Sequence, residues 1–207
     1  MSDVHEELSR LGTATVYEAS GREGMVDVNF EQVVPGSRAA GPARTVRCGQ
    51  GDNLMVHAVM DRVEPGDVLV LTMPEPEPVA LVGELLATQA ECRGAAALLV
   101  DAAVRDVEEL REMGLPVWAR WVRVRGADKQ AVGSIDEAVE VGGAQIRPGD
   151  AVVLDTDGIV VVQRERLDQV LAASRERAER EVDKRAKLSA GSLSYDLDGL
   201  RELVEGK

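Results

Sequence analysis

The middle of the chain alternates short, wholly apolar runs with stretches in which apolar residues recur every three or four positions. An apolar run of about four to eight residues is typical of a buried strand, and the three-to-four spacing is typical of an amphipathic helix. The pattern predicts strands at 68–72, 96–100 and 117–120, with helices at 83–93 and 105–113 between them. Such alternation produces right-handed crossovers, so part of the sheet should be parallel.

Shorter elements flank this segment on both sides. Helical spacing broken by Gly-Thr predicts a helix, a turn and a helix over 4–22, and a further helix is expected at 52–60 with Asp52 as its N-cap. Short β-rich pieces bounded by Gly or Pro predict strands, and these lie at 32–38, 41–46, 137–141, 144–147, 151–155 and 158–162. The sequence Asp155-Thr-Asp-Gly158 predicts a hairpin turn between the last two pieces.

The phrase Pro-Gly-Asp occurs twice, at 65–67 and 148–150, each time before an apolar β-branched run. Pro-Gly favours a tight turn, and two copies are too few to indicate a solenoid. We therefore expect two similar turns that lead into strands of one sheet system.

The last long helix is expected at 165–188 and is charged nearly all round. Two interpretations remain open: a solvated helix stabilised by ion pairs four residues apart, or a helix that reaches across a subunit boundary. We place one domain over residues 1–190 and a C-terminal tail over 191–207, since a chain of about 200 residues can bury one sizeable core.

Charge and composition exclude several classes of protein. The 207 residues include 24 Lys and Arg against 37 Asp and Glu, a net charge of −13. Such a surface repels phosphate backbones, so nucleic-acid binding is not expected, although a local arginine or a metal can still attract a small anion. No apolar run approaches the roughly 20 residues needed to span a bilayer, and no glycine-rich nucleotide loop follows a strand.

The two cysteines, Cys48 and Cys92, are too few for a disulfide framework, and no secretory segment precedes the fold. Reduced thiols are typical of a cytoplasmic protein, and we expect both side chains to be buried as small hydrophobes. His5 and His57 lack the spacing of a metal site and are expected to be structural or exposed.

A candidate anion site follows two of the predicted strands, where ligands of open α/β sheets bind. The first amides of a helix have no intrahelical partner, so the amides of Leu85 and Leu86 could hold a substrate carboxylate, and Gly83 would permit close approach. Arg105 follows the next strand and could fork onto a carboxylate or a keto oxygen.

Glu84 and Asp106 add hard oxygen ligands beside this anion site. Carboxylates suit Mg²⁺ or Mn²⁺, which usually keep several waters. The alternative is structural: Asp101 and Arg105, four residues apart, could simply cap a helix, and Asp106 could simply complement a helix dipole. Together, these residues could bind a divalent metal and a small 2-oxo acid.

Several segments together resemble the RraA-like family, which includes 4-hydroxy-4-methyl-2-oxoglutarate/4-carboxy-4-hydroxy-2-oxoadipate aldolases and regulators of ribonuclease E activity. The similar segments are Leu11-Gly-Thr-Ala-Thr-Val-Tyr17, Gly51-Asp-Asn-Leu54, Glu64-Pro-Gly-Asp67, Gly83-Glu-Leu-Leu86, Arg93-Gly94, Asp101-x-x-x-Arg105-Asp106, Gly142-Gly143, Pro148-Gly-Asp150 and Asp155-x-Asp157-Gly158. The resemblance extends from about residue 8 to residue 190. The family pattern has Asp-Gly where this chain has Asp101-Ala102, and the loop 74–78 is unusually rich in proline and acid.

The resemblance implies an α/β layered sandwich of the swivelling-domain type, with a βαβ-containing central sheet and a charged C-terminal helix. It implies a homotrimer or hexamer with sites between subunits. Arg105 would bind pyruvate, Asp106 would ligate the divalent metal directly, and Glu84 would reach the metal through water. The Leu85 and Leu86 amides would hold the carboxylate. A glutamate on the C-terminal helix of a neighbouring subunit would also reach the metal through water; Glu181 is the residue we assign, with Glu179 as its rival.

The expected activity is retro-aldol cleavage of a 4-hydroxy-2-oxo di- or tricarboxylic acid to pyruvate and a second oxo acid. It would depend on Mg²⁺ or Mn²⁺, and oxaloacetate decarboxylation would be a side activity through the same enolate. Water near Glu84 and Asp106 would take the proton of the 4-hydroxyl group. The motifs contain no lysine, which argues against a Schiff-base aldolase, and Lys129 is expected to be a surface residue of a loop.

The other candidate is a non-enzymatic regulator with the same fold. Its acidic surface would bind an Arg-rich segment of a ribonuclease. Retention of Glu84, Arg105 and Asp106 favours the enzyme.

Overall fold

A computed structural model describes residues 3–206 and shows a mixed α/β fold. Within these residues the main sheet has nine strands: Glu31–Gln32 (β1), Ala39–Arg47 (β2), Val68–Thr72 (β3), Ala80–Val82 (β4), Ala97–Val104 (β5), Val117–Val122 (β6), Ser134–Ile135 (β7), Ala151–Leu154 (β10) and Ile159–Val162 (β11). Seven lie in the order β1-β6-β5-β3-β2-β10-β11, while β4 pairs with β5 and β7 pairs with β2. The pairs from β6 to β2 are parallel and those at both ends are antiparallel.

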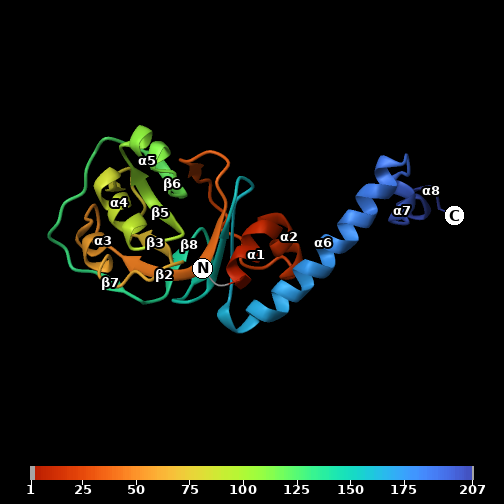
Figure 1. The fold of residues 1–207 in the computed structure, drawn as a ribbon, viewed down its shortest axis with the longest axis horizontal. Helices are drawn as coiled ribbons and strands as arrows, with labels where there is room; N and C mark the ends of the chain where they lie inside the picture. The colour runs from red at the N-terminus through yellow and green to blue at the C-terminus, as the bar shows by residue number, and fades with distance from the viewer. Residues whose placement is uncertain (1–2, 207) are drawn as a thin grey trace.

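Three helices cover one face of this sheet: Leu54–Val59 (α3), Glu84–Cys92 (α4) and Val107–Met113 (α5) (Figure 1). Their buried side chains, including Val56, Leu86 and Leu110, join those of the parallel strands in one hydrophobic cluster. Every residue of β3 and β5 is buried. Strands covered on both faces read as continuous apolar runs, which is why the sequence pattern identified them.

A second cluster fills the opposite face. There the small hairpin of Val139–Val141 (β8) and Ala144–Ile146 (β9) packs with Trp118, Val70 and Leu99. The Trp118 indole N–H donates to the carbonyl of Asp155 at 3.1 Å, so this large buried ring keeps its polar atom satisfied. The expected α/β layered architecture is therefore confirmed.

A third cluster lies at the β10–β11 end of the sheet. The helices Asp3–Leu11 (α1) and Thr13–Ala19 (α2) pack there with the start of the long helix Leu167–Ser189 (α6), through side chains that include Leu8, Val16 and Leu171. A short 3-10 turn, Arg164–Arg166, leads into α6. The predicted helix, turn and helix over 4–22 is confirmed.

The C-terminal half of α6 projects away from the body and carries the short helices Ser194–Leu197 (α7) and Leu200–Glu205 (α8) at its far end (Figure 1). Val170, Leu171 and Ser174 are buried in α6, all of them in its first turns. The predicted charged helix is confirmed, and the tail beyond it contains two helices. Within residues 3–206, no helix is both long enough and apolar enough to cross a membrane.

Most predicted strands appear close to their expected positions, two differ, and the short strands β4 and β7 were not predicted. The strand expected at 96–100 continues to Val104, and a strand not predicted, β4, pairs in parallel with its second half. The piece expected at 32–38 contributes only the end of β1. Its remainder is a turn, because the Gln32 side chain accepts from the Gly36 N–H and donates to the Ser37 carbonyl.

Both Pro-Gly-Asp phrases form the same turn, as expected. The Asp67 carboxylate accepts from the Glu64 N–H at 3.0 Å, and the Asp150 carboxylate accepts from the Arg147 N–H at 2.8 Å. The two turns lead into β3 and β10, which flank β2 on either side. The predicted hairpin at Asp155 is also confirmed, since β10 and β11 are antiparallel neighbours.

The prediction for the cysteines is half right. Cys48 is buried and burial raises the pKa of its thiol to about 12, which makes it unreactive. Cys92 is exposed at the end of α4. This difference could not be predicted from the local pattern, because a free cysteine behaves as a small hydrophobe that fits the face of a helix as well as a core.

Candidate functional site

A cavity of about 420 Å³ opens at the carboxyl ends of β4 and β5. Its wall contains all six residues that the sequence predicted for a site in one subunit: Gly83, Glu84, Leu85, Leu86, Arg105 and Asp106. The first four begin α4 directly after β4, and the last two lie between β5 and α5. The parallel pairing of β4 with β5 brings the two segments together.

Asp106 joins the two segments. Its Oδ2 accepts a hydrogen bond from the Glu84 N–H at 3.0 Å. The residue has a φ of 58°, in the left-handed region that Asp tolerates better than most residues. A Cβ on residue 83 would lie 2.3 Å from Asp106 Oδ2, so glycine is required for this close approach. Gly83 was predicted to permit close approach of a ligand; the close approach that the structure shows is that of the Asp106 carboxylate.

Arg105 lies beside this junction, half exposed. Its Nε is 3.6 Å from Asp106 Oδ2, and its backbone N–H donates to the Val82 carbonyl at 3.0 Å. A Cβ on residue 126 would come within 2.9 Å of Arg105 Nη1, so Gly126 leaves space for the guanidinium. The arginine is thus held near a carboxylate without being buried, and its remaining donors can reach a ligand.

The start of α4 supplies backbone donors. The Ala87 N–H already donates to the Gly83 carbonyl at 3.1 Å, and the Glu84 N–H is taken by Asp106. The amides of Leu85 and Leu86 precede the first intrahelical bonds and have no carbonyl of their own helix to reach. The Leu85 side chain is 78% exposed, unusual for leucine, and it lies at the cavity mouth.

Seven other residues of the cavity wall were not predicted as site residues, and the four polar or charged ones are Asn53, His57, Glu109 and Lys129. Asn53 Nδ2 donates to the Leu81 carbonyl at 2.9 Å and so ties α3 to β4. The pKa of His57 is lowered by partial burial and by the positive charge of Lys129. Lys129 is exposed in a loop, as expected, but that loop borders the cavity. Local sequence gave no signal for these side chains, since the tertiary fold alone brings α3 and this loop to the site.

The predicted N-cap is wrong by one residue, because the residue that precedes α3 is Asn53; Asp52 lies one position earlier and binds backbone amides of two segments. Its Oδ1 accepts from the Leu54 N–H at 2.8 Å, while Oδ2 accepts from the N–H groups of Gln130 at 2.6 Å and Ala131 at 3.0 Å. The carboxylate is almost fully buried. Burial alone would raise its pKa, but the three backbone donors and nearby Lys129 outweigh that effect and lower it.

Asp101 lies outside the cavity, and the structural alternative in which Asp101 and Arg105 cap a helix is wrong. It is a buried residue within β5 and accepts a hydrogen bond from Arg120 Nε of β6. Burial raises the pKa of this carboxyl, although Arg120 opposes the effect. Neither Asp101 nor Arg105 caps a helix, because the strand continues to Val104. The neighbouring Ala102 is buried in the same strand.

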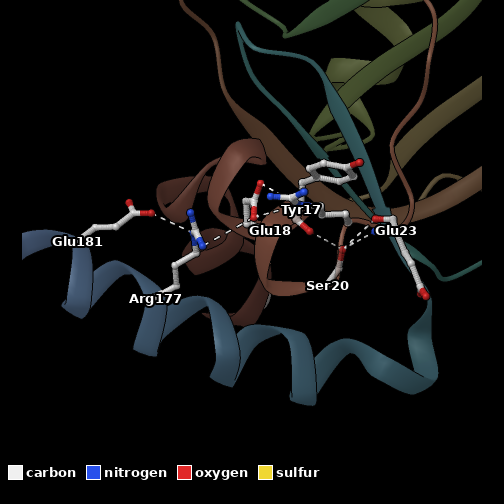
Figure 2. Close-up of polar contacts among 7 residues, drawn as sticks. Tyr17, Glu18, Ser20, Glu23, Arg177 and Glu181 are labelled. Atoms are coloured by element: carbon white, nitrogen blue, oxygen red, sulfur yellow. Dashed lines mark hydrogen bonds and ion pairs between the residues drawn. The ribbon is translucent and has the colours of Figure 1, made fainter. Parts of the chain in front are cut away.

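Glu181 and Glu179 belong to the C-terminal half of α6, and no residue of α6 lines this chain's own cavity. That half of the helix projects away from α3, α4 and α5 (Figure 1). Glu181 forms an ion pair with Arg177 at 2.9 Å, and Arg177 is 3.8 Å from Glu18 of α2 (Figure 2). Two further ion pairs connect this region: Glu7 of α1 with Arg175 of α6, and Glu23, which follows α2, with Arg166, which precedes α6. These contacts fix the direction in which α6 leaves the body.

The donors in the cavity fit a divalent cation. Glu84 and Asp106 are hard oxygen ligands on one wall, and Asp106 Oδ1 is not engaged by the bond to the Glu84 amide. Mg²⁺ is commonly bound by one or two carboxylates and keeps several waters. Among the side chains of residues 3–206, no group of three or more His, Cys, Asp and Glu converges on one metal position. Further ligands would have to be water, substrate or a residue of another subunit.

Comparison with known proteins gives a consistent result. The family model for RraA-like proteins, described as Aldolase/RraA, matches residues 4–161. A protein of Halalkalibacterium halodurans that carries the provisional name 4-hydroxy-4-methyl-2-oxoglutarate aldolase is 34% identical over 150 residues, which is 72% of this chain and 71% of that protein.

Two examples of solved structures with a similar fold carry the name RraA. The RNA-processing inhibitor RraA from Thermus thermophilis is 30% identical with a TM-score of 0.67, covering 72% of this chain and 91% of that one. RraAS2 from Streptomyces coelicolor, titled an unusual member of the RNase ES inhibitor RraA family, is 27% identical with a TM-score of 0.78, covering 89% of this chain and 96% of that one.

Proposed function

Because the chain belongs to the RraA-like family, we propose that it is a metal-dependent pyruvate aldolase rather than a member without catalytic activity. Its substrate would be a 4-hydroxy-2-oxo di- or tricarboxylic acid of the 4-hydroxy-4-methyl-2-oxoglutarate type. The observation that carries the proposal is the shared wall formed by Arg105, Asp106, Glu84 and the first amides of α4. A protein that acted only by binding a partner would have no need for this combination in a cavity.

The α4 amides and Arg105 would bind the 2-oxo acid end of the substrate. The Leu85 and Leu86 N–H groups suit the carboxylate, since amides at a helix start favour an anion. Arg105 would donate to the keto oxygen, where negative charge accumulates when the C3–C4 bond breaks. Because Asp106 already holds the Arg105 guanidinium in place, this side chain needs little reorganisation during the reaction.

The bond cleavage requires one proton to leave and one to return. The 4-hydroxyl group loses its proton to water held near Glu84, and the C3–C4 electron pair becomes the enolate of pyruvate. The second product leaves as a carbonyl compound, and the enolate takes up a proton at C3. Oxaloacetate would release CO₂ in place of the carbonyl compound, so decarboxylation should accompany aldol cleavage.

Glu84 and Asp106 would hold Mg²⁺ or Mn²⁺, which as a Lewis acid stabilises negative charge on the keto oxygen. The two carboxylates also keep the metal and the guanidinium on one wall of the cavity. Asp106 has a second role, because its bond to the Glu84 amide sets the spacing between the two segments.

We also propose that the active protein is a homotrimer or hexamer whose sites lie between subunits. The support is the projecting half of α6, which contributes nothing to its own cavity and has no buried residue beyond Ser174 within residues 3–206. Glu181, or Glu179 beside it, would then reach the cavity of a neighbouring subunit.

The test is pyruvate release from a panel of 4-hydroxy-2-oxo acids, before and after removal of divalent metal with a chelator. Activity should disappear with the chelator and return with Mg²⁺ or Mn²⁺. The Asp106→Ala variant should remain folded and lose most of its affinity for Mn²⁺, measured by calorimetry. Full activity in the chelator would refute metal dependence.

The second candidate function is regulation of a ribonuclease through direct binding. It is favoured by the two relatives titled RraA and by the net charge of −13, which suits a basic partner segment. The Arg105→Ala variant separates the two functions, because it should abolish pyruvate release and leave any such binding unchanged.

A further inference from the structure

Lys129 is a second cation on the wall of the same cavity. It lies in the loop 126–131, whose first residue, Gly126, is next to the Arg105 guanidinium: a Cβ there would come within 2.9 Å of Arg105 Nη1. Three residues of chain span at most about 11 Å, so Arg105 and Lys129 can contact opposite ends of one small ligand. Within residues 3–206, the Lys129 ammonium has no carboxylate at ion-pair distance.

The backbone on both sides of Lys129 is hydrogen-bonded to residues 51–53, which directly precede α3. On one side, the Asn53 N–H donates to the Asp128 carbonyl at 2.8 Å, and the Asp128 N–H donates to the Gly51 carbonyl at 2.9 Å. On the other side, Asp52 Oδ2 accepts from the Gln130 and Ala131 N–H groups. These hydrogen bonds hold the backbone of Lys129 in place, although its side chain is exposed.

Asp52 is committed to this task. Both of its oxygens are engaged by backbone N–H groups, so the carboxylate orders the loop and leaves the Lys129 charge available to a ligand. Burial of a carboxylate charge is costly unless hydrogen bonds compensate it, and here three backbone N–H groups do so. The buried charge of Asp52 therefore serves to hold this loop at the cavity.

We propose that Lys129 binds the distal carboxylate of the substrate and makes the site selective for dicarboxylic over monocarboxylic 2-oxo acids, with Asp52 as its positioning residue. This inference rests on the proposed function for the identity of the proximal end, where the α4 amides and Arg105 take the 2-oxo acid group. Recognition of the distal end does not depend on bond cleavage. An ammonium group forms a charge-assisted hydrogen bond with a carboxylate and forms none with a methyl group.

Binding tests the inference without requiring catalysis. 2-Oxoglutarate and 2-oxopentanoate differ only in the distal carboxylate, and neither has the 4-hydroxyl group that retro-aldol cleavage needs. With Mg²⁺ present, calorimetry should show that the wild-type protein prefers 2-oxoglutarate. Lys129→Met should weaken 2-oxoglutarate binding about 10- to 100-fold, the usual effect of one charge-assisted bond, and leave 2-oxopentanoate binding unchanged. Lys129→Arg should keep the preference.

The matched control is Lys184→Met, which removes a lysine that pairs with Asp198 on the projecting helix. It should leave both affinities at the wild-type value. Equal weakening of both ligands by Lys129→Met, or no weakening of either, would overturn the proposal.

Cleavage then separates this inference from the proposed function. 4-Hydroxy-4-methyl-2-oxoglutarate and 4-hydroxy-4-methyl-2-oxopentanoate differ in the same carboxylate. If the wild-type protein cleaves neither but shows the binding preference, the proposed reaction fails and the distal site stands. If it cleaves both with equal kcat/KM, the distal site fails and the reaction stands.

Asp52→Asn tests the positioning role. It should reduce the preference for 2-oxoglutarate, raising KM for the dicarboxylic substrate more than it lowers kcat. In the double variant with Lys129→Met, the two losses should not add, because one acts through the other. Additive losses, or equal losses for the dicarboxylic and monocarboxylic ligands, would show that Asp52 only stabilises the fold.

Discussion

At the scale of single residues, the candidate site depends on Asp106. Its left-handed backbone turns the chain out of β5, and its carboxylate reaches back to the first amide of α4. Gly83 makes the contact possible because any side chain there would collide with Asp106 Oδ2. One aspartate thus contacts both the first amide of α4 and the Arg105 guanidinium.

Arg105 should be sensitive even to a conservative change. Lysine offers a point charge on a flexible stem where arginine offers a planar fork. Arg105→Lys and Arg105→Ala should each lower kcat by about 10²–10³, the usual effect of losing one donor to a developing negative charge. Aldol cleavage and oxaloacetate decarboxylation should fall together, since both pass through the same enolate. Arg123→Lys, an exposed residue just after β6, is the control; near-native rates for Arg105→Lys would remove Arg105 from its assigned role.

Asp52 should make stability depend on pH in acid. Its folded-state pKa lies below the ordinary value of 3.8, so the ionised carboxylate stabilises the fold above that pH and this contribution is lost as the pH falls through the folded-state pKa. Asp52→Asn should lower the free energy of unfolding by about 1–3 kcal/mol near neutral pH, because backbone donors lose their acceptor. Urea unfolding should show this difference shrinking below about pH 4. A difference that is constant down to pH 2 would contradict the assignment.

At the scale of elements, α6 has two halves with different roles. The first turns bury Val170 and Leu171 against α1, α2 and the end of the sheet. The second half is held in direction by ion pairs such as Arg177 with Glu18, which are partly exposed and worth little to stability individually. The charged pattern therefore belongs to a helix that packs on the body of the protein at its N-terminal end and projects from the body at its C-terminal end.

Removal of residues 191–207 tests the domain boundary. Within the described part of this segment no side chain is buried, so the shortened protein should unfold at the same temperature within a few degrees. Leu171→Ala, in the docked half, should instead cost about 2–5 kcal/mol, as expected for a buried leucine. Calorimetry of both proteins checks the contrast. A large loss of stability on truncation would mean that the tail belongs to the folded domain.

At the scale of the whole molecule, the helices α3 and α4, which contribute residues to the cavity wall, lie far from the projecting half of α6 in one chain (Figure 1). A second copy is the simplest way to bring a helix glutamate to the site. Subunits of Arg105→Ala and Glu181→Ala proteins, each inactive alone, should regain activity when they are mixed and exchanged, because some sites then contain both native residues. Glu179→Ala repeats the test for the rival residue. Proven exchange without recovery would place both glutamates outside the site.

The sequence alone determined the parallel centre of the fold. Continuous apolar runs such as Val68–Thr72 must be covered on both faces, and the helical spacing between them provides that cover. It also determined the local turns, because Pro-Gly-Asp carries its own acceptor for the turn amide. The six residues predicted for one cavity were found from their positions after strands and at a helix start, which are properties of short segments.

Only the tertiary structure decided which distant residues share that cavity. The strand β4 is three residues long, too short for periodicity to reveal, yet its pairing with β5 brings Glu84 to Asp106. Asp101 and Arg105 are four positions apart, but the strand between them turns Asp101 toward Arg120 instead. Lys129 reaches the site because the Asp52 carboxylate holds a loop nearly eighty residues away. Contacts of this kind depend on side chains meeting across the fold, and no local pattern of hydrophobic and polar residues encodes them.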